Sequence, residues 1–249
     1  MIILKSRQEI EKMRKAGLVV ADVLDGIREL IKPGITTQAL DEFAEKRIVS
    51  AGARPAFKGY RGFPKTLCTS LNEQVVHGIP SREVSLKEGD IISVDVGAIV
   101  EGFYGDGAKT FPVGKVSPEA ERLIRVTEES LEKGIAEATA GKRLYDISSA
   151  VQRHVEANGF SVVREFVGHG IGRNMHEDPQ IPNFGERGQG PRLKAGMVLA
   201  IEPMVNSGGA GTVVKEDGWT AVTADGSLSA HFEHTIAIMP EGPWILTKK

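Results

Sequence analysis

Apolar residues recur every three or four positions in four stretches of the chain, which predicts four amphipathic helices. A capping box formed by Ser6 and Glu9 marks the start of the first helix. Pro33-Gly34 ends it. The predicted helices follow Ser6, run from about Thr37 to Ser50, run from Ser117 to Ala140, and run from about Tyr145 to Ala157.

Two other stretches are near-copies of each other, and each contains a nearly all-apolar strand after a turn. Residues 86–95 and 193–202 each have the pattern of a turn followed by a strand, and counterpart residues lie 107 positions apart. The glycines that end the helices repeat with the same offset. Because such apolar strands are usually covered on both faces, the repeat predicts an α+β fold with one curved sheet and helices on its convex face. We expect a single domain, 1–249, whose pseudo-symmetric halves cover about 1–113 and 114–249.

Each near-copy ends on an acid, Asp95 or Glu202. An isolated buried charge costs several kcal/mol, so such an acid must be paired, protonated or bound to a cation. Asp106 follows Asp95 by 11 residues on the return of a predicted hairpin, and Glu233 follows Glu202 by 31 residues on a hairpin with a longer loop. His169, between two glycines, is a fifth candidate, because glycine lets the backbone approach a site closely.

Four carboxylates and one imidazole suit two divalent cations, because the four negative charges then balance four positive charges. Carboxylates that bridge the two ions would hold them about 3.5–4 Å apart. An oxygen-rich set with one nitrogen favours Mn, Fe, Co or Zn, and the choice among these metals stays open.

Composition restricts the class of protein and the cellular compartment in which this chemistry would take place. The chain has 249 residues, is 41% hydrophobic and has a net charge of -2, so no global basic field points to nucleic acid. No apolar run approaches the roughly 20 residues that span a bilayer, and the N-terminus lacks the pattern of a secretory signal. Cys68 is the only cysteine, which excludes an internal disulfide. We therefore expect a cytoplasmic protein.

An ordered set of motifs along the whole chain resembles the bacterial type I methionine aminopeptidases. The motifs are His77-Gly78-Ile79-Pro80, Asp95-Val96-Gly97, Asp106, Gly168-His169-Gly170-Ile171-Gly172, His176-Glu177-Asp178-Pro179, Glu202-Pro203 and Phe232-Glu233-His234-Thr235. The resemblance implies the pita-bread fold, with a curved antiparallel sheet and internal pseudo-two-fold symmetry. It also implies removal of the initiator methionine from nascent polypeptides whose second residue is small. We expect a monomer, and the sequence leaves the oligomeric state open.

The resemblance also implies a role for each site residue. Asp95 would bind one metal, His169 and Glu202 the other, and Asp106 and Glu233 both. A hydroxide between the ions would attack the methionyl carbonyl, with Glu202 as proton shuttle. His77 and His176 would contact the substrate amide and stabilise the tetrahedral intermediate.

The methionine side chain needs an apolar slot, which the resemblance places at Tyr60, Phe63, Cys68 and Trp219. Phe57 and Met175 are further candidates of lower rank. Cys68 has no catalytic partner at a recognisable spacing, so we interpret it as a pocket or core residue rather than a nucleophile. His154, in a helical stretch, is expected to be structural.

Three alternatives remain to be separated from this interpretation. Proline-specific peptidases share the fold but carry a large N-terminal domain, for which 76 residues before His77 leave no room, and type II enzymes carry an insert that the step from Glu202 to Glu233 is too short to contain. A binding module without catalysis would have lost metal ligands, and this chain has all five.

The roles of His231 and His234, which flank Glu233 and could orient it, stay open. Contact with the ribosome also stays open, because the region 206–220 has one lysine, Lys215, beside two acids.

Overall fold

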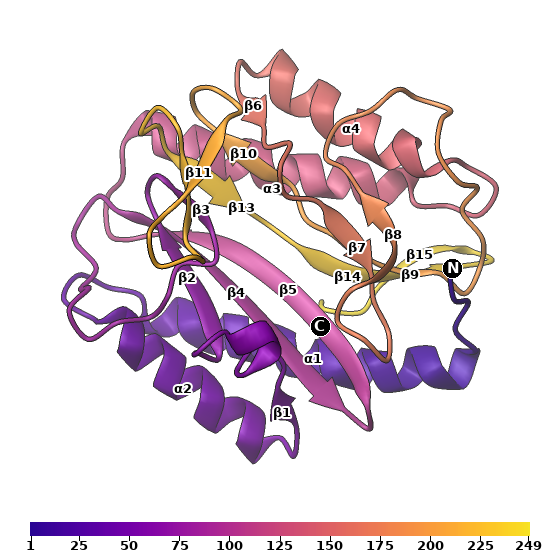
Figure 1. Cartoon of the computed structure of the whole chain (residues 1–249), viewed down its shortest axis with the longest axis horizontal. Helices are drawn as coiled ribbons and strands as arrows, with labels where there is room; N and C mark the ends of the chain where they lie inside the picture. The colour runs from indigo at the N-terminus through magenta and orange to yellow at the C-terminus, as the bar shows by residue number, and fades with distance from the viewer.

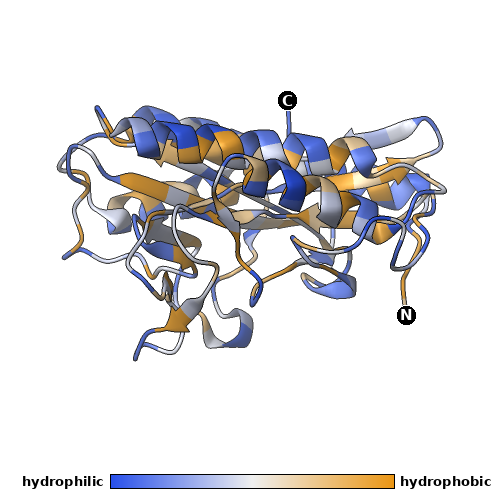
Figure 2. Cartoon of the chain, turned by 90° about the horizontal axis from the view of Figure 1, so that it is seen from above, coloured by the Kyte–Doolittle hydropathy of each residue, from blue (hydrophilic) through white to orange (hydrophobic).

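Four helices lie on one face of a layer of strands, and loops cover the opposite face (Figure 1, Figure 2). The computed structural model describes residues 1–249. Its helices are α1 (Arg7–Leu30), α2 (Thr37–Ser50), α3 (Pro118–Glu137) and α4 (Leu144–Ala157), with a short 3-10 helix at Tyr60–Gly62. Its strands are β1 (Arg54–Pro55), β2 (Leu67–Leu71), β3 (Gln74–Val76), β4 (Ile91–Val100), β5 (Phe103–Pro112), β6 (Ser161–Val162), β7 (Gly168–Gly170), β8 (Glu177–Ile181), β9 (Val198–Ile201), β10 (Met204–Asn206), β11 (Thr212–Val214), β12 (Ala221–Thr223), β13 (Ser229–His231), β14 (His234–Met239) and β15 (Gly242–Ile245).

The four predicted helices are present, and the predicted α+β class is confirmed. The backbone N–H of Glu9 donates to the Ser6 hydroxyl and the Ser6 N–H donates to the Glu9 carboxylate, which is the predicted capping box of α1. α3 ends at Glu137, earlier than the predicted Ala140. The chain turns there so that the Gly141 N–H can donate to the carbonyl of Leu193, 2.9 Å away. None of the helices combines the length and apolar character needed to cross a lipid bilayer.

The repeat seen in the sequence reappears in the pairing of the strands. β1 pairs with β4 through Arg54–Ile99, and β6 pairs with β10 through Ser161–Asn206, which is the same pair shifted by 107 residues. The helices α2 and α4 have the same relation at both ends. Apolar residues of α1 and α2 pack on β4, and those of α3 and α4 pack on β9, β10 and β14, so each half covers its own strands.

Hydrogen bonds between residues 106–110 of β5 and residues 231–235 join the two groups of strands at the centre of the layer. We call these two segments the seam. The Glu233 N–H donates to the Ala108 carbonyl at 2.9 Å. On one side of this contact the Thr235 hydroxyl accepts from the Asp106 N–H at 3.0 Å and donates to the Asp106 carbonyl at 2.7 Å. The Thr110 hydroxyl bonds the N–H and carbonyl of His231 in the same way on the other side.

Two predicted loops contain strands instead. The segment between Glu202 and Glu233 holds the hairpin β11–β12, and β12 pairs with β3 of the first half, so this insertion crosses from one half to the other. The glycine- and proline-rich residues 178–191, whose composition is typical of a loop, include most of β8, which pairs with β7. Both strands gain their partners from distant residues, which the local composition could not reveal.

The seam predicts the effect of removing one hydroxyl. Thr235→Val keeps the shape of the side chain but leaves the buried N–H and carbonyl of Asp106 without partners, and each orphaned group costs about 1–3 kcal/mol. We expect the free energy of unfolding, measured with urea, to fall by at least about 2 kcal/mol. Thr212→Val on the partly exposed strand β11 is the control and should change it by less than about 0.5 kcal/mol. Equal effects of the two substitutions would show that the hydroxyl bridge does not stabilise the seam.

Candidate metal centre and its pocket

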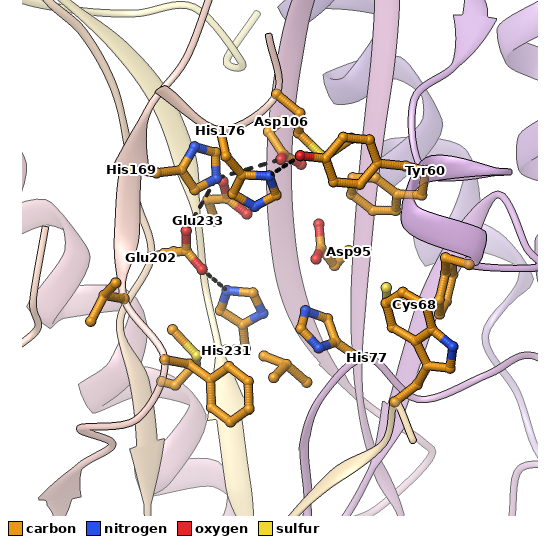
Figure 3. Close-up of a pocket in the computed structure, with 18 of the residues that line it drawn as sticks. Tyr60, Cys68, His77, Asp95, Asp106, His169, His176, Glu202, His231 and Glu233 are labelled. Carbon is orange, nitrogen blue, oxygen red and sulfur yellow. Dashed lines mark hydrogen bonds and ion pairs between the residues drawn. The ribbon is translucent and has the colours of Figure 1, made fainter. Parts of the chain in front are cut away.

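Four acids converge on one space above the seam (Figure 3). Asp95 lies in the middle of β4, and Asp106 lies on β5, where it pairs with Gly97. Glu202 directly follows β9 and Glu233 directly precedes β14, so the second pair of acids sits where the ladder of β9 and β14 gives way to that of β10 and β13. The strands of both halves thus bring together the acids that the sequence pointed to.

His169 on β7 turns one ring nitrogen toward these acids. Its Nε2 lies 3.5 Å from Oε1 of Glu202 and 4.0 Å from Oδ2 of Asp106. Its Nδ1 lies 2.9 Å from the carbonyl of Gly170 and donates to it, because a carbonyl can only accept. Nε2 therefore presents its lone pair to the acids, as a metal-binding imidazole does.

Without a cation, burial disfavours the charged form of these carboxylates. It raises the pKa values of Asp95, Glu202 and Glu233 well above their usual range, and the neighbouring negative charge of Asp106 raises all three further. Burial also raises the pKa of Asp106, to about 7. It lowers the pKa of His169 to about 4, which keeps the imidazole neutral at physiological pH.

The orphaned atoms of the cluster test whether the residues fit a metal. Oδ1 of Asp95, Oδ1 of Asp106 and Oε1 of Glu233 are buried and have no hydrogen-bond partner. Single donor atoms of Asp106, His169 and Glu233 lie within 4.8 Å of one another, and the same holds for Glu202, His231 and Glu233. Unpartnered buried oxygens facing a neutral imidazole fit divalent cations, since cations would both satisfy and neutralise them.

Two further histidines stand at the opening of this cluster. The ring of His176 lies 4.3 Å from that of His169, and its Nδ1 is 2.8 Å from the hydroxyl of Tyr60. If the tyrosine donates this hydrogen bond, Nε2 of His176 carries the proton and can donate to a substrate. Burial lowers the pKa of His77 to about 4, and the ring meets Phe166 and Trp219 edge to face.

The backbone at His77 adopts a left-handed conformation, with φ of +62°. Such a conformation in a residue other than glycine costs on the order of 1–3 kcal/mol and persists where neighbours enforce it. Here Gly78 enforces it. Its N–H donates to the Ser70 hydroxyl at 3.2 Å, and its carbonyl accepts from the N–H of Thr69 at 2.8 Å. A Cβ on Gly78 would lie only 2.1 Å from the Thr69 carbonyl oxygen, so glycine is required.

A buried ion pair attaches the loop between His169 and His176 to the N-terminal segment. Nζ of Lys5 lies 2.5 Å from Oε2 of Glu177, and the two side chains are 4% and 6% exposed. The other oxygen of Glu177 accepts from the N–H of Asn174 at 3.1 Å. Because Glu177 directly follows His176, the pair fixes where that histidine enters the pocket.

One cavity of about 190 Å³ is lined both by these acids and by apolar side chains. It is smaller than the roughly 300–1,000 Å³ of drug-sized ligand pockets, so it can enclose only a small group. Cys68 pairs with Asp95 across β2 and β4, which places the thiol between the acids and the apolar wall. Phe63 and Trp219 meet edge to face with ring centroids 5.1 Å apart. Trp219 comes from the segment between β11 and β12. There the Asp217 carboxylate accepts a hydrogen bond from the backbone N–H of Trp219 at 2.8 Å.

All the site residues named from the sequence line this one cavity. They are Tyr60, Phe63, Cys68, His77, Asp95, Asp106, His169, His176, Glu202, Trp219 and Glu233, and the lower-ranked Phe57 and Met175 join them. Sequence reasoning missed Arg61, Val76, Phe166, Val167 and Met204, which also line it. Each of the five lies within three residues of a predicted site residue, and this proximity was the available signal.

The histidines whose roles were open are now separated. His231 lines the cavity, with Nε2 3.9 Å from Oε2 of Glu202. His234 does not line it, because its Nδ1 is hydrogen-bonded to the Thr247 hydroxyl at 2.8 Å. His154 makes a hydrogen bond to Glu129 between α4 and α3, away from the cavity, in agreement with a structural role.

Known proteins resemble this chain over its full length. The model of metallopeptidase family M24 matches residues 11–240. The methionine aminopeptidase of Clostridium perfringens is 59% identical over 247 residues, covering 99% of each chain, and methionine aminopeptidase 1 of Bacillus subtilis is 55% identical, covering 100% of each.

Solved structures agree. The crystal structure of a methionine aminopeptidase from Thermotoga maritima has a TM-score of 0.99 at 53% identity, covering 100% of each chain. The prolidase of Pyrococcus horikoshii has a TM-score of 0.80 at 23% identity and is covered over 64% of its length, which shows a shared fold alone. The expected pita-bread fold is thereby confirmed. On these grounds the chain belongs to metallopeptidase family M24 and, within it, to the bacterial type I methionine aminopeptidases.

Proposed function

We propose that this protein is a metal-dependent aminopeptidase that removes methionine from the N-terminus of new polypeptides when the second residue is small. The observation that carries the proposal is the single small cavity that is lined both by buried, unpartnered carboxylate oxygens and by apolar side chains. An exopeptidase for methionine needs both parts. The slot selects the side chain, and the acids bind what activates the peptide bond.

We assign the metal-binding role to Asp95, Asp106, His169, Glu202 and Glu233, with Asp106 and Glu233 shared between two ions. Two divalent ions would cancel the four carboxylate charges. When bound, such ions act as Lewis acids on the substrate carbonyl and lower the pKa of water to near neutrality. Co, Mn, Fe and Zn are the candidates, because the set combines oxygen donors with imidazole.

The protein's own groups bind the substrate and manage protons around it. The neutral imidazoles of His77 and His176 can donate hydrogen bonds to the peptide oxygen as it gains charge, which stabilises the tetrahedral intermediate. Oε2 of Glu202 is available for a proton, since its burial raises the pKa of this carboxyl. The rings of Tyr60, Phe63 and Trp219, together with Cys68, exclude water from the methionine side chain.

The proposal also covers the domain organisation, the oligomeric state and the cellular location of the protein. Residues 1–249 form one catalytic domain, with halves at about 1–113 and 114–249 that meet at the seam and share the metal centre. The enzyme acts as a monomer in the cytoplasm, where N-termini of nascent polypeptides emerge. Contact with the ribosome is not assigned to the region 206–220, since Lys215 stands beside Glu216 and Asp217 there.

A peptide assay tests the proposed function. With added Mn(II) or Co(II), the protein should release methionine from Met-Ala-Ser and leave a peptide with a bulky second residue, such as Met-Leu-Ser, largely intact. Dipeptides of the form X-Pro, measured in parallel by the released amino acids, should not be cleaved. Activity on X-Pro bonds alone would replace the proposal with a proline-specific peptidase, and no activity on any peptide would favour a binding module.

Asp106→Asn tests the shared ligand. The substitution keeps the side-chain shape but removes the charge and half of the oxygen donors, so we expect turnover of Met-Ala-Ser to fall at least about 100-fold. The circular dichroism spectrum should stay unchanged. Asp25→Asn, on an exposed acid of α1, should keep normal turnover. Near-normal turnover in Asp106→Asn would remove this residue from the metal centre.

Asp106→Asn lowers turnover, but the raised pKa of Asp106 predicts that the same substitution favours the metal-free fold over that of wild type as pH rises. In the unfolded chain this carboxyl ionises near 3.8 and in the fold near 7, so the fold loses stability as pH rises between these values. With metal chelated, the free energy of unfolding of Asp106→Asn relative to wild type should therefore rise by about 2–3 kcal/mol from pH 5 to pH 8. Adding Mn(II) at pH 8 should reverse the order, because only the wild type gains full binding energy. A pH-independent difference in urea unfolding would contradict this reasoning.

A further inference from the structure

Arg61 is the only arginine or lysine among the residues that line the cavity. It lies in the short 3-10 helix at Tyr60–Gly62 and is exposed to solvent. Other arginines of the chain are paired with acids, as Arg47 is with Asp22, but no acid pairs with Arg61. A permanent positive charge therefore stands without a partner at the edge of the cavity.

The backbone of Arg61 is left-handed, with φ of +50° and ψ of +23°. Glycine adopts such a conformation without strain, and Gly59 and Gly62 do so on either side. Only three other residues that are not glycine have a positive φ, and one of them, His77, also lines the cavity. A long side chain kept at a left-handed position indicates that the side chain itself is used.

The ring of Tyr60 orients the guanidinium of Arg61. Cζ of Arg61 lies 5.4 Å from the centre of this ring, which is a cation–π contact. Tyr60 stacks in turn on His176, with ring centroids 5.4 Å apart, and its hydroxyl is 2.8 Å from Nδ1 of that histidine (Figure 3). Burial lowers the pKa of His176, and the charge of Arg61 lowers it further. The guanidinium is thus one aromatic ring away from the histidine that would contact the substrate amide.

The size of the cavity determines which part of a substrate meets Arg61. Because about 190 Å³ encloses only a small group, the third and later residues of a polypeptide must lie outside. Residues of an extended chain advance by about 3.3–3.6 Å each, so the third residue lies only about 7 Å from the methionine. The exposed guanidinium at the edge of the cavity is therefore placed to contact the third residue.

We propose that Arg61 binds the carboxylate of an aspartate or glutamate at the third position of the substrate, so that polypeptides with an acidic third residue are processed faster. The inference rests on the proposed function and adds a preference to it. A guanidinium matches a carboxylate through two parallel N–H···O bonds, whereas a lysine in the same place would be repelled. The acids of the metal centre do not offset this charge, because two bound cations would neutralise them.

Peptides that differ only at the third residue test this proposal. With added Mn(II), kcat/KM for methionine release from Met-Ala-Asp-Ser-amide should exceed that for Met-Ala-Lys-Ser-amide at least about fivefold, with Met-Ala-Asn-Ser-amide in between. The amide removes the C-terminal carboxylate, which would otherwise compete for the same guanidinium. Sodium chloride at about 0.5 M should reduce the preference, because salt screens an exposed ion pair.

Substitutions at Arg61 assign the preference to this residue. Arg61→Gln should lower the ratio of the Asp peptide to the Lys peptide below about twofold, and Arg61→Glu should reverse it, because like charges repel. Arg122→Gln is the matched control, since Arg122 also lies over an aromatic ring, that of Phe160, but does not line the cavity. This control should keep the wild-type ratio.

The outcomes separate this preference from the proposed function. Equal cleavage of the three peptides by the wild type, or a preference that persists in Arg61→Gln, would overturn the role of Arg61 alone. An equal loss of activity on all three peptides in Arg61→Gln would also overturn it, since the residue would then be structural. A wild type that releases no methionine from any peptide would overturn the proposed function and this preference with it. Arg61→Gly, which suits the left-handed backbone, replaces Arg61→Gln if the latter does not fold.

Discussion

The contact between the two halves of the chain is the constraint on which the site depends. At the seam, Glu233 and Ala108 bond through their backbones, and the Thr235 and Thr110 hydroxyls bridge the strands on either side. These bonds hold Asp106 of β5 beside the segment that carries Glu233, so that donor atoms of the two side chains and of His169 lie within 4.8 Å of one another. The pseudo-symmetry of the fold thus produces a symmetric pair of acids without either half containing the site.

The same geometry sets stability against function. Burial raises the pKa values of all four acids, and the charge of Asp106 raises those of the other three further, so the folded protein without a cation is less stable as pH rises through the region where they ionise. The surrounding structure compensates for this with dense apolar packing of both helix pairs on their strands. The strained backbone at His77 adds to the cost. Strain and buried charge are both concentrated around one cavity, as stability–function trade-offs predict for a functional site.

Much of this was accessible from the sequence, for reasons that can be stated physically. The helices followed from apolar spacing and caps, and the acids Asp95 and Glu202 followed from their place at the ends of apolar, repeated strands. The hairpin β11–β12 was not accessible, because its partner β3 lies about 140 residues away in the chain and its exposed valines give no burial signal. His231 and His234 illustrate the same limit. His231 lies two residues before Glu233 and His234 one residue after it. One faces the cavity and the other Thr247, since only the side chains of alternate residues share a face and these two histidines are three residues apart.

The seam also has a consequence for folding during translation. Asp106 finds its partner Thr235 only after 129 further residues have been made, and closing so long a loop is slow compared with forming the local helices. While its second half is still being synthesised, the chain therefore contains Asp95 and Asp106 but lacks Glu202 and Glu233.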